Sequence, residues 1–178
     1  IDTAQLDARL LAQAVCGLTA AAALAEPERP LSASELDLLQ AYRHRRAARE
    51  PVSRILGSRG FMDFELEITP ATLDPRPDTE VLVEAAIELL TAEGRTHEPL
   101  VIADLGTGSG AILVALLKAL PAAHGLGIDI SPEALDVAQR NMARHGVGNR
   151  ARLHRGSWFK NISMAFDLII SNPPYIPT

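Results

Sequence analysis

The sequence predicts an α/β protein: a parallel sheet flanked by helices, preceded by a small helical bundle and a connecting β-hairpin. Three observations predict this fold class. From residue 99 onward, short apolar runs alternate with helical patterns, which is typical of parallel strands covered by helices on both faces. The first 50 residues are alanine-rich and have helical periodicity. Between these regions, a short stretch alternates apolar and polar side chains.

Residues 1–50 are expected to form the helical bundle, as a first domain. Leu6 and Leu10 lie on one face of a first helix, and residues 26–30, which include two prolines, interrupt the pattern. Ser32 followed by Glu35 matches a capping box, which predicts the start of a further helix. Nothing in these residues indicates catalysis, so we interpret them as a packing or docking unit.

Residues 51–77 are predicted to form a linker and the hairpin. The apolar members of the strand alternation are Phe64, Leu66 and Ile68. The prolines within residues 74–80 then fix an extended segment. Asp78 or Thr79 is expected to cap the helix that follows.

Residues 78–178 are expected to form the sheet domain. The predicted strands are residues 100–105, 124–128, 150–154 and 166–171, and the helices between them are residues 111–120 and 132–145. Ser131 is expected to cap the second of these helices, with Pro132 at its first position.

A glycine-rich turn joins the first predicted strand to its helix. It consists of Asp104, Leu105, Gly106, Thr107, Gly108, Ser109 and Gly110. Glycines let a backbone turn tightly and approach a ligand closely. The spacing fits the dinucleotide fingerprint, and it equally fits the S-adenosyl-L-methionine version, in which Asp104 lies near the cationic end of the cofactor. A strand-to-helix turn with no ligand does not need three alternating glycines.

Asp129 ends the second predicted strand, and an acid at this place can accept hydrogen bonds from both hydroxyls of a ribose. This feature suits NAD and S-adenosylmethionine alike. The turn and Asp129 therefore predict a nucleoside-type cofactor without choosing between the two.

The motif Asn172-Pro173-Pro174-Tyr175 follows the fourth predicted strand and decides between them. An amide nitrogen is a poor nucleophile and must be oriented toward the methyl carbon. The Asn172 side-chain oxygen and the Pro173 carbonyl can accept its two N–H groups, which favours the positive charge that develops on nitrogen. The prolines stiffen the backbone, and Tyr175 can pack on the flat acceptor. The motif predicts methyl transfer to a planar NH₂ group.

Composition narrows the function class. The formal net charge of −5 argues against a protein that coats nucleic acid by charge alone. The single cysteine, Cys16, excludes an internal disulfide and is compatible with a reducing cytosol. No apolar run is long enough to span a membrane, and no signal peptide is visible. We therefore expect a cytoplasmic enzyme with no membrane partner.

Together these motifs resemble the HemK-type peptide-chain release factor glutamine (N5) methyltransferases. The further residues that carry this resemblance are Glu50-Pro51-Val52, Ile55-Leu56-Gly57, Phe61, Thr69-Pro70-Ala71-Thr72-Leu73 and Pro75-Arg76-Pro77-Asp78-Thr79-Glu80. The resemblance implies a Rossmann-like class I methyltransferase sheet. Family members continue well past the Asn-Pro-Pro-Tyr motif, so we expect the sheet to be truncated at its C-terminal end.

The resemblance also implies roles for individual residues. Residues 106–110 and Asp129 would hold S-adenosylmethionine, with Asn172 beside it and Trp158 next to the adenine. Residues 172–175 would grip the glutamine of the Gly-Gly-Gln loop of a class 1 release factor, leaving S-adenosyl-L-homocysteine as product. The helical N-terminus would dock that protein, and no direct contact with nucleic acid is required. Two positions depart from the family pattern: Ser157 and Asp74.

Other functions remain open on the sequence alone. An N-methyltransferase acting on exocyclic amino groups of rRNA or DNA bases would share the Asn-Pro-Pro-Tyr motif. A non-catalytic binding module is disfavoured by the intact motif and cofactor turn. An NAD-dependent reductase is disfavoured because the motif has no role in hydride transfer.

Overall fold

The computed structural model describes residues 3–173, so Pro174 and Tyr175 lie outside the described residues. The chain divides into two compact units, Ile1–Gly57 and Ser58–Thr178.

The first unit is helical, as predicted. Its helices are α1 (Ala4–Cys16), α2 (Ala20–Ala25), α3 (Ala33–Ala47) and α4 (Val52–Leu56). The predicted capping box begins α3: the Glu35 N–H donates to Ser32 Oγ at 3.2 Å, and the Ser32 N–H donates to Glu35 Oε2 at 2.7 Å. Arg46 Nε donates to Asp7 Oδ2 at 2.7 Å and so ties α3 to α1.

The second unit begins with the predicted hairpin, β1 (Ser58–Phe61) and β2 (Phe64–Glu67), whose strands pair antiparallel. The side chains of Phe61 and Leu66 are fully buried in the core of this unit. The apolar face that the alternation predicted is therefore the face that packs.

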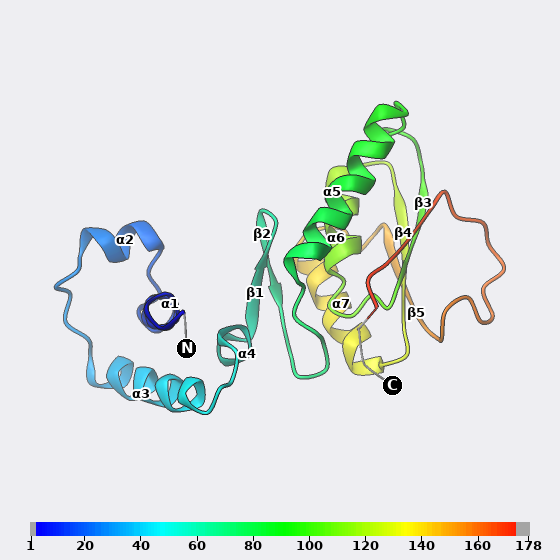
Figure 1. The fold of residues 1–178 in the computed structure, drawn as a ribbon. Helices are drawn as coiled ribbons and strands as arrows, with labels where there is room; N and C mark the ends of the chain where they lie inside the picture. The colour runs from blue at the N-terminus through cyan, green and yellow to red at the C-terminus, as the bar shows by residue number, and fades with distance from the viewer. Residues whose placement is uncertain (1–2, 174–178) are drawn as a thin grey trace. The chain divides into compact units, whose positions relative to one another are not determined.

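A four-stranded parallel sheet is the main sheet of the second unit (Figure 1). Its strands are β3 (Val101–Leu105), β4 (His124–Asp129), β5 (Ala151–Arg155) and β6 (Leu168–Ser171), in the order β5-β4-β3-β6. The helices of this unit are α5 (Pro77–Ala92), α6 (Ala111–Ala119) and α7 (Pro132–Arg144). Because β4 and β6 lie on opposite sides of β3, a crevice for a ligand is expected at the carboxyl end of β3.

Helices cover one face of the sheet in the described part of the chain, not the two faces that the apolar runs predicted. Figure 1 shows α5, α6 and α7 along the same side, and Ile169 of β6 is 53% exposed. Right-handed connections explain this arrangement. The successive steps from β3 to β4 and β5 place α6 and α7 on one face, whereas the step from β5 back to β6 belongs on the other. That step, residues 156–167, contains no helix.

The start of α5 also differs from the prediction. Neither Asp78 nor Thr79 caps it; the N-cap is Arg76, which makes no side-chain capping bond, and Pro77 occupies the first turn. Proline suits the first helical position because its missing N–H has no partner there, and this moves the helix start upstream. The predicted Ser131 cap of α7 is confirmed, since its hydroxyl accepts the Ala134 N–H at 3.1 Å. Across residues 3–173, every helix is too short or too polar to cross a membrane.

Candidate active site

The register of the sheet brings the predicted motifs to one edge. Leu105 of β3 pairs with Ile128 of β4 on one side and with Ser171 of β6 on the other. The Ser171 hydroxyl donates to the Leu105 carbonyl at 2.8 Å. The glycine turn, Asp129 and Asn172 follow these positions directly, so all of them lie at the carboxyl edge of the sheet.

The three glycines of the turn have positive φ angles but different surroundings. At Gly106 (φ 72°) a Cβ atom would meet nothing within 4 Å, and at Gly108 (φ 54°) it would meet only the Gly106 carbonyl at 3.9 Å. At Gly110 (φ 80°) it would lie 3.2 Å from the Ala138 Cβ. The first two glycines therefore leave open space beside the backbone, whereas the third allows α6 to pack on α7.

The backbone donors of the turn are mostly used within the protein. The N–H groups of Gly106 and Thr107 both donate to the Ile128 carbonyl, at 2.8 and 3.0 Å. The Gly108 N–H donates to Asp129 Oδ2 at 2.9 Å. A pyrophosphate at a glycine turn needs free N–H groups, and three of the donors it would use here are already engaged. This geometry disfavours the dinucleotide interpretation.

Asp104 lies beneath the turn with no exposed surface. Thr107 Oγ1 donates to its Oδ2 at 2.6 Å, and its Oδ1 has no hydrogen-bond partner among residues 3–173. Burial raises the pKa of the Asp104 carboxyl to about 7, against the hydrogen bond from Thr107; the charge of Asp129 adds to the rise. Two neighbouring carboxyl groups make this place unfavourable for a phosphate and favourable for a cation.

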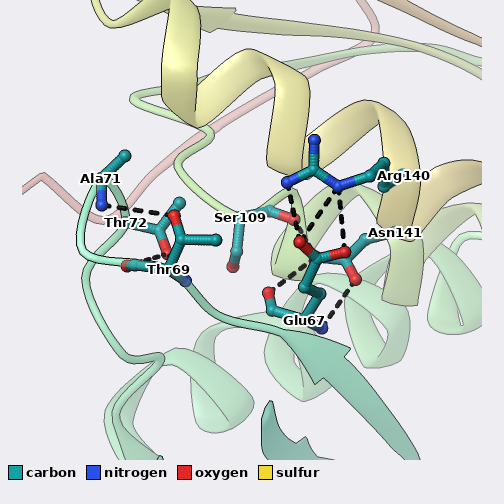
Figure 2. A network of polar contacts seen from close by, with 7 residues as sticks. All are labelled: Glu67, Thr69, Ala71, Thr72, Ser109, Arg140 and Asn141. Carbon is teal, nitrogen blue, oxygen red and sulfur yellow. Dashed lines mark hydrogen bonds and ion pairs between the residues drawn. The ribbon is translucent and has the colours of Figure 1, made fainter. Parts of the chain in front are cut away.

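Asn141 of α7 fastens the turn to the hairpin (Figure 2). Its Nδ2 donates to the Ser109 carbonyl at 2.9 Å and to the Glu67 carbonyl at 3.1 Å, and its Oδ1 accepts the Glu67 N–H at 2.8 Å. Asn141 is fully buried, and the neighbouring Arg140 pairs with the Glu67 carboxylate at 2.7 Å. One side chain thus fixes both the end of β2 and the glycine turn.

The predicted acceptor motif begins with Asn172, directly after β6. Its Nδ2 donates to the Oγ1 of Thr79 on α5 at 2.7 Å. Among residues 3–173 the Asn172 side chain has no second hydrogen-bond partner, so Oδ1 is available to accept an N–H. Pro173 is exposed, and its carbonyl is a second acceptor. The predicted roles of Pro174 and Tyr175 fall outside the described residues.

Trp158 follows β5, next to the Asp129 end of β4. The Gly156 N–H donates to the Asp129 carbonyl at 3.0 Å, which holds the start of the loop there. Trp158 has a positive φ of 51° and is 59% exposed. Its side chain is thus largely exposed, in the loop that leaves the sheet beside Asp129.

Two side chains of this site were not predicted from the sequence. Thr79 lies in the Pro-Arg-Pro-Asp-Thr-Glu segment that carries the resemblance, but the only role predicted for its side chain was to cap α5. Asn141 could have been singled out as a polar residue on the face of α7 that also carries Ala138 and Met142, both buried.

Two family models match the chain. Residues 1–57 match the PrmC N-terminal domain, and residues 79–177 match the methyltransferase small domain. The chain belongs to the methyltransferase small domain family. The resemblance to HemK-type release factor glutamine methyltransferases is also confirmed, because relatives named release factor glutamine methyltransferase match this chain over its whole length.

A release factor glutamine methyltransferase of Rhodospirillum rubrum is 50% identical over 178 residues, which are 100% of this chain and 53% of that protein. One of Caulobacter vibrioides is 45% identical over 100% of this chain and 61% of its own length. One of Bradyrhizobium diazoefficiens is 44% identical over 100% of this chain and 60% of its own. The chain therefore spans a little over half the length of the curated relatives it matches.

Proposed function

We propose that the protein transfers a methyl group from S-adenosylmethionine to the side-chain nitrogen of the glutamine in the Gly-Gly-Gln loop of a peptide chain release factor. The observation that carries the proposal is Asn172 at the end of β6, with its NH₂ group held by Thr79 and its oxygen available. The names of the relatives support the substrate class. A cytoplasmic location follows from this substrate, which acts where proteins are translated.

The residues at the sheet edge fit this cofactor. S-adenosylmethionine supplies an electrophilic methyl group on a sulfonium and leaves as S-adenosylhomocysteine. Asp129 would hold the ribose hydroxyls, because each carboxylate oxygen can accept a further hydrogen bond beyond those from Gly108 and Ser131. The open space at Gly106 and Gly108 admits the ligand. Trp158 would stack beside the adenine.

The buried Asp104 acts from below the turn. It has no exposed surface, so it shapes the loop through Thr107 and contributes negative potential without touching the ligand. A cation near the turn favours the ionised form of a carboxyl whose pKa is about 7. The engaged N–H groups of the turn and this acidic setting support S-adenosylmethionine over NAD.

The acceptor side supplies orientation and charge stabilisation. The Asn172 oxygen would accept one N–H of the glutamine amide and the Pro173 carbonyl the other. Both contacts strengthen as nitrogen becomes positive, so they stabilise the transition state more than the ground state. The proton leaves after transfer, so no general base is needed. The helical unit is proposed to dock the release factor.

The test is methyl transfer from radiolabelled S-adenosylmethionine to a release factor, with mass spectrometry of the Gly-Gly-Gln peptide. The assay uses the protein with any residues that precede or follow this sequence in its natural form. We expect a gain of one methyl group on the glutamine. Asn172→Ala should lower the rate about 100-fold or more while cofactor binding persists. Asn149→Ala, an exposed asparagine just before β5 at the opposite edge, should have no effect. Labelling of ribosomal RNA or duplex DNA alone would refute the proposal in favour of a base-amino methyltransferase.

A further inference from the structure

The hydrogen bond between Thr79 and Asn172 joins two segments that are 93 positions apart in the chain. Thr79 lies in the first turn of α5 and is 5% exposed, so its hydroxyl is shielded from water. The Asn172 Nδ2 donates to this hydroxyl at 2.7 Å, which is short for a neutral hydrogen bond.

We propose that Thr79 is a positioning residue that holds the Asn172 side-chain amide in place, with Nδ2 on the Thr79 hydroxyl and the oxygen left for the substrate. The two ends of an asparagine amide are nearly equal in size but opposite in hydrogen bonding, since the oxygen accepts and the nitrogen donates. An acceptor NH₂ group needs the oxygen. A hydroxyl can accept from Nδ2 or donate to Oδ1, so the contact acts by restricting rotation of the Asn172 side chain. In the structure it engages Nδ2 and leaves the oxygen for the substrate.

The helix that carries Thr79 is itself firmly held. Val83 and Leu90 of α5 are buried in the core. At the start of the helix, Glu80 Oε1 accepts the Met62 N–H of the hairpin turn at 3.0 Å. A hydroxyl presented from so constrained a helix loses little conformational entropy when it forms the contact. This inference rests on the proposed role of Asn172 as the residue that binds the acceptor.

The test compares Thr79→Val, which keeps the branched shape but removes the hydroxyl, with Thr79→Ser, which keeps the hydroxyl. We expect T79V to lower kcat about tenfold, the effect of one neutral hydrogen bond, with little change in KM for the release factor. T79S should recover most of the rate. Thr91→Val is a matched control, because Thr91 also lies on α5 but donates to the Ile87 carbonyl and is exposed; it should behave as wild type.

A second measurement does not depend on activity. The side-chain NH₂ resonances of Asn172 should shift in T79V and exchange faster with solvent, and remain in place in T91V. A T79V enzyme with wild-type kcat, an Asn172 NH₂ signal that does not move, or equal losses in T79V and T79S would each overturn the inference. If wild type methylates a nucleic-acid base and no release factor, the proposed substrate is wrong, and the Thr79 comparison is made on that base.

Discussion

The buried carboxyl of Asp104 should make the protein less stable as pH rises toward neutrality. Its pKa is about 7 in the folded protein, whereas the ordinary value, expected in the unfolded chain, is 3.8. The folded state therefore binds the proton more tightly than the unfolded chain does. The stabilisation from this protonated carboxyl is complete below about pH 4. It is lost as pH rises through the pKa of the folded state. The variant Asp104→Asn serves as the reference, because its side chain at this position does not titrate.

The expected magnitude follows from proton linkage. Between pH 5 and pH 7 the free energy of unfolding of wild type, relative to Asp104→Asn, should fall by about 2 kcal/mol. Urea denaturation followed by circular dichroism at several pH values measures this difference. Carboxyls whose pKa values are lowered, such as Glu35 and Asp167, are common to both proteins and cancel. A difference that stays constant from pH 5 to pH 7 would refute the assignment of a raised pKa to Asp104.

Three further substitutions test the frame of the site. Gly110→Ala should cost about 1–3 kcal/mol of unfolding free energy, because its Cβ would lie 3.2 Å from the Ala138 Cβ; Gly94→Ala, with a similar φ of 72° and open space, isolates the backbone contribution. Asn141→Ala removes three hydrogen bonds and should cost roughly 2–4 kcal/mol in urea denaturation, and equal stability would contradict it. Trp158→Ala should weaken S-adenosylmethionine binding about tenfold in calorimetry; unchanged affinity would exclude stacking.

The sequence predicted the parts of the site that depend on local pattern. The alternation of strands and helices along the chain, the glycine turn and Asp129 could be predicted, because each is encoded in neighbouring residues and parallel strands place such residues at one edge. The capping box at Ser32 could also be predicted from local spacing, since both of its hydrogen bonds join residues three positions apart. These features need no knowledge of which segments meet in space.

The remaining features depend on long-range contacts. The bond from Asn172 to Thr79 spans 93 positions and that from Asn141 to Glu67 spans 74, and no local spacing encodes either. The pKa of Asp104 depends on its burial beneath the turn, which is a property of packing. Coverage of only one sheet face could not be predicted either, because apolar strands indicate burial without identifying what lies on each side.

The hairpin links the two halves of the site. At Glu67 it is fastened through Asn141 to the glycine turn, and at Met62 it is fastened through Glu80 to α5. Helix α5 in turn holds Asn172 through Thr79. The proposed cofactor side and the proposed acceptor side are therefore connected by hydrogen bonds as well as by the sheet. Methyl transfer requires the donor carbon and the acceptor nitrogen to be aligned, and small misplacements are costly to the rate. In the proposed reaction, a hairpin anchored at both positions would restrict such misplacement, and the segment before the sheet would take a direct part in the geometry of transfer.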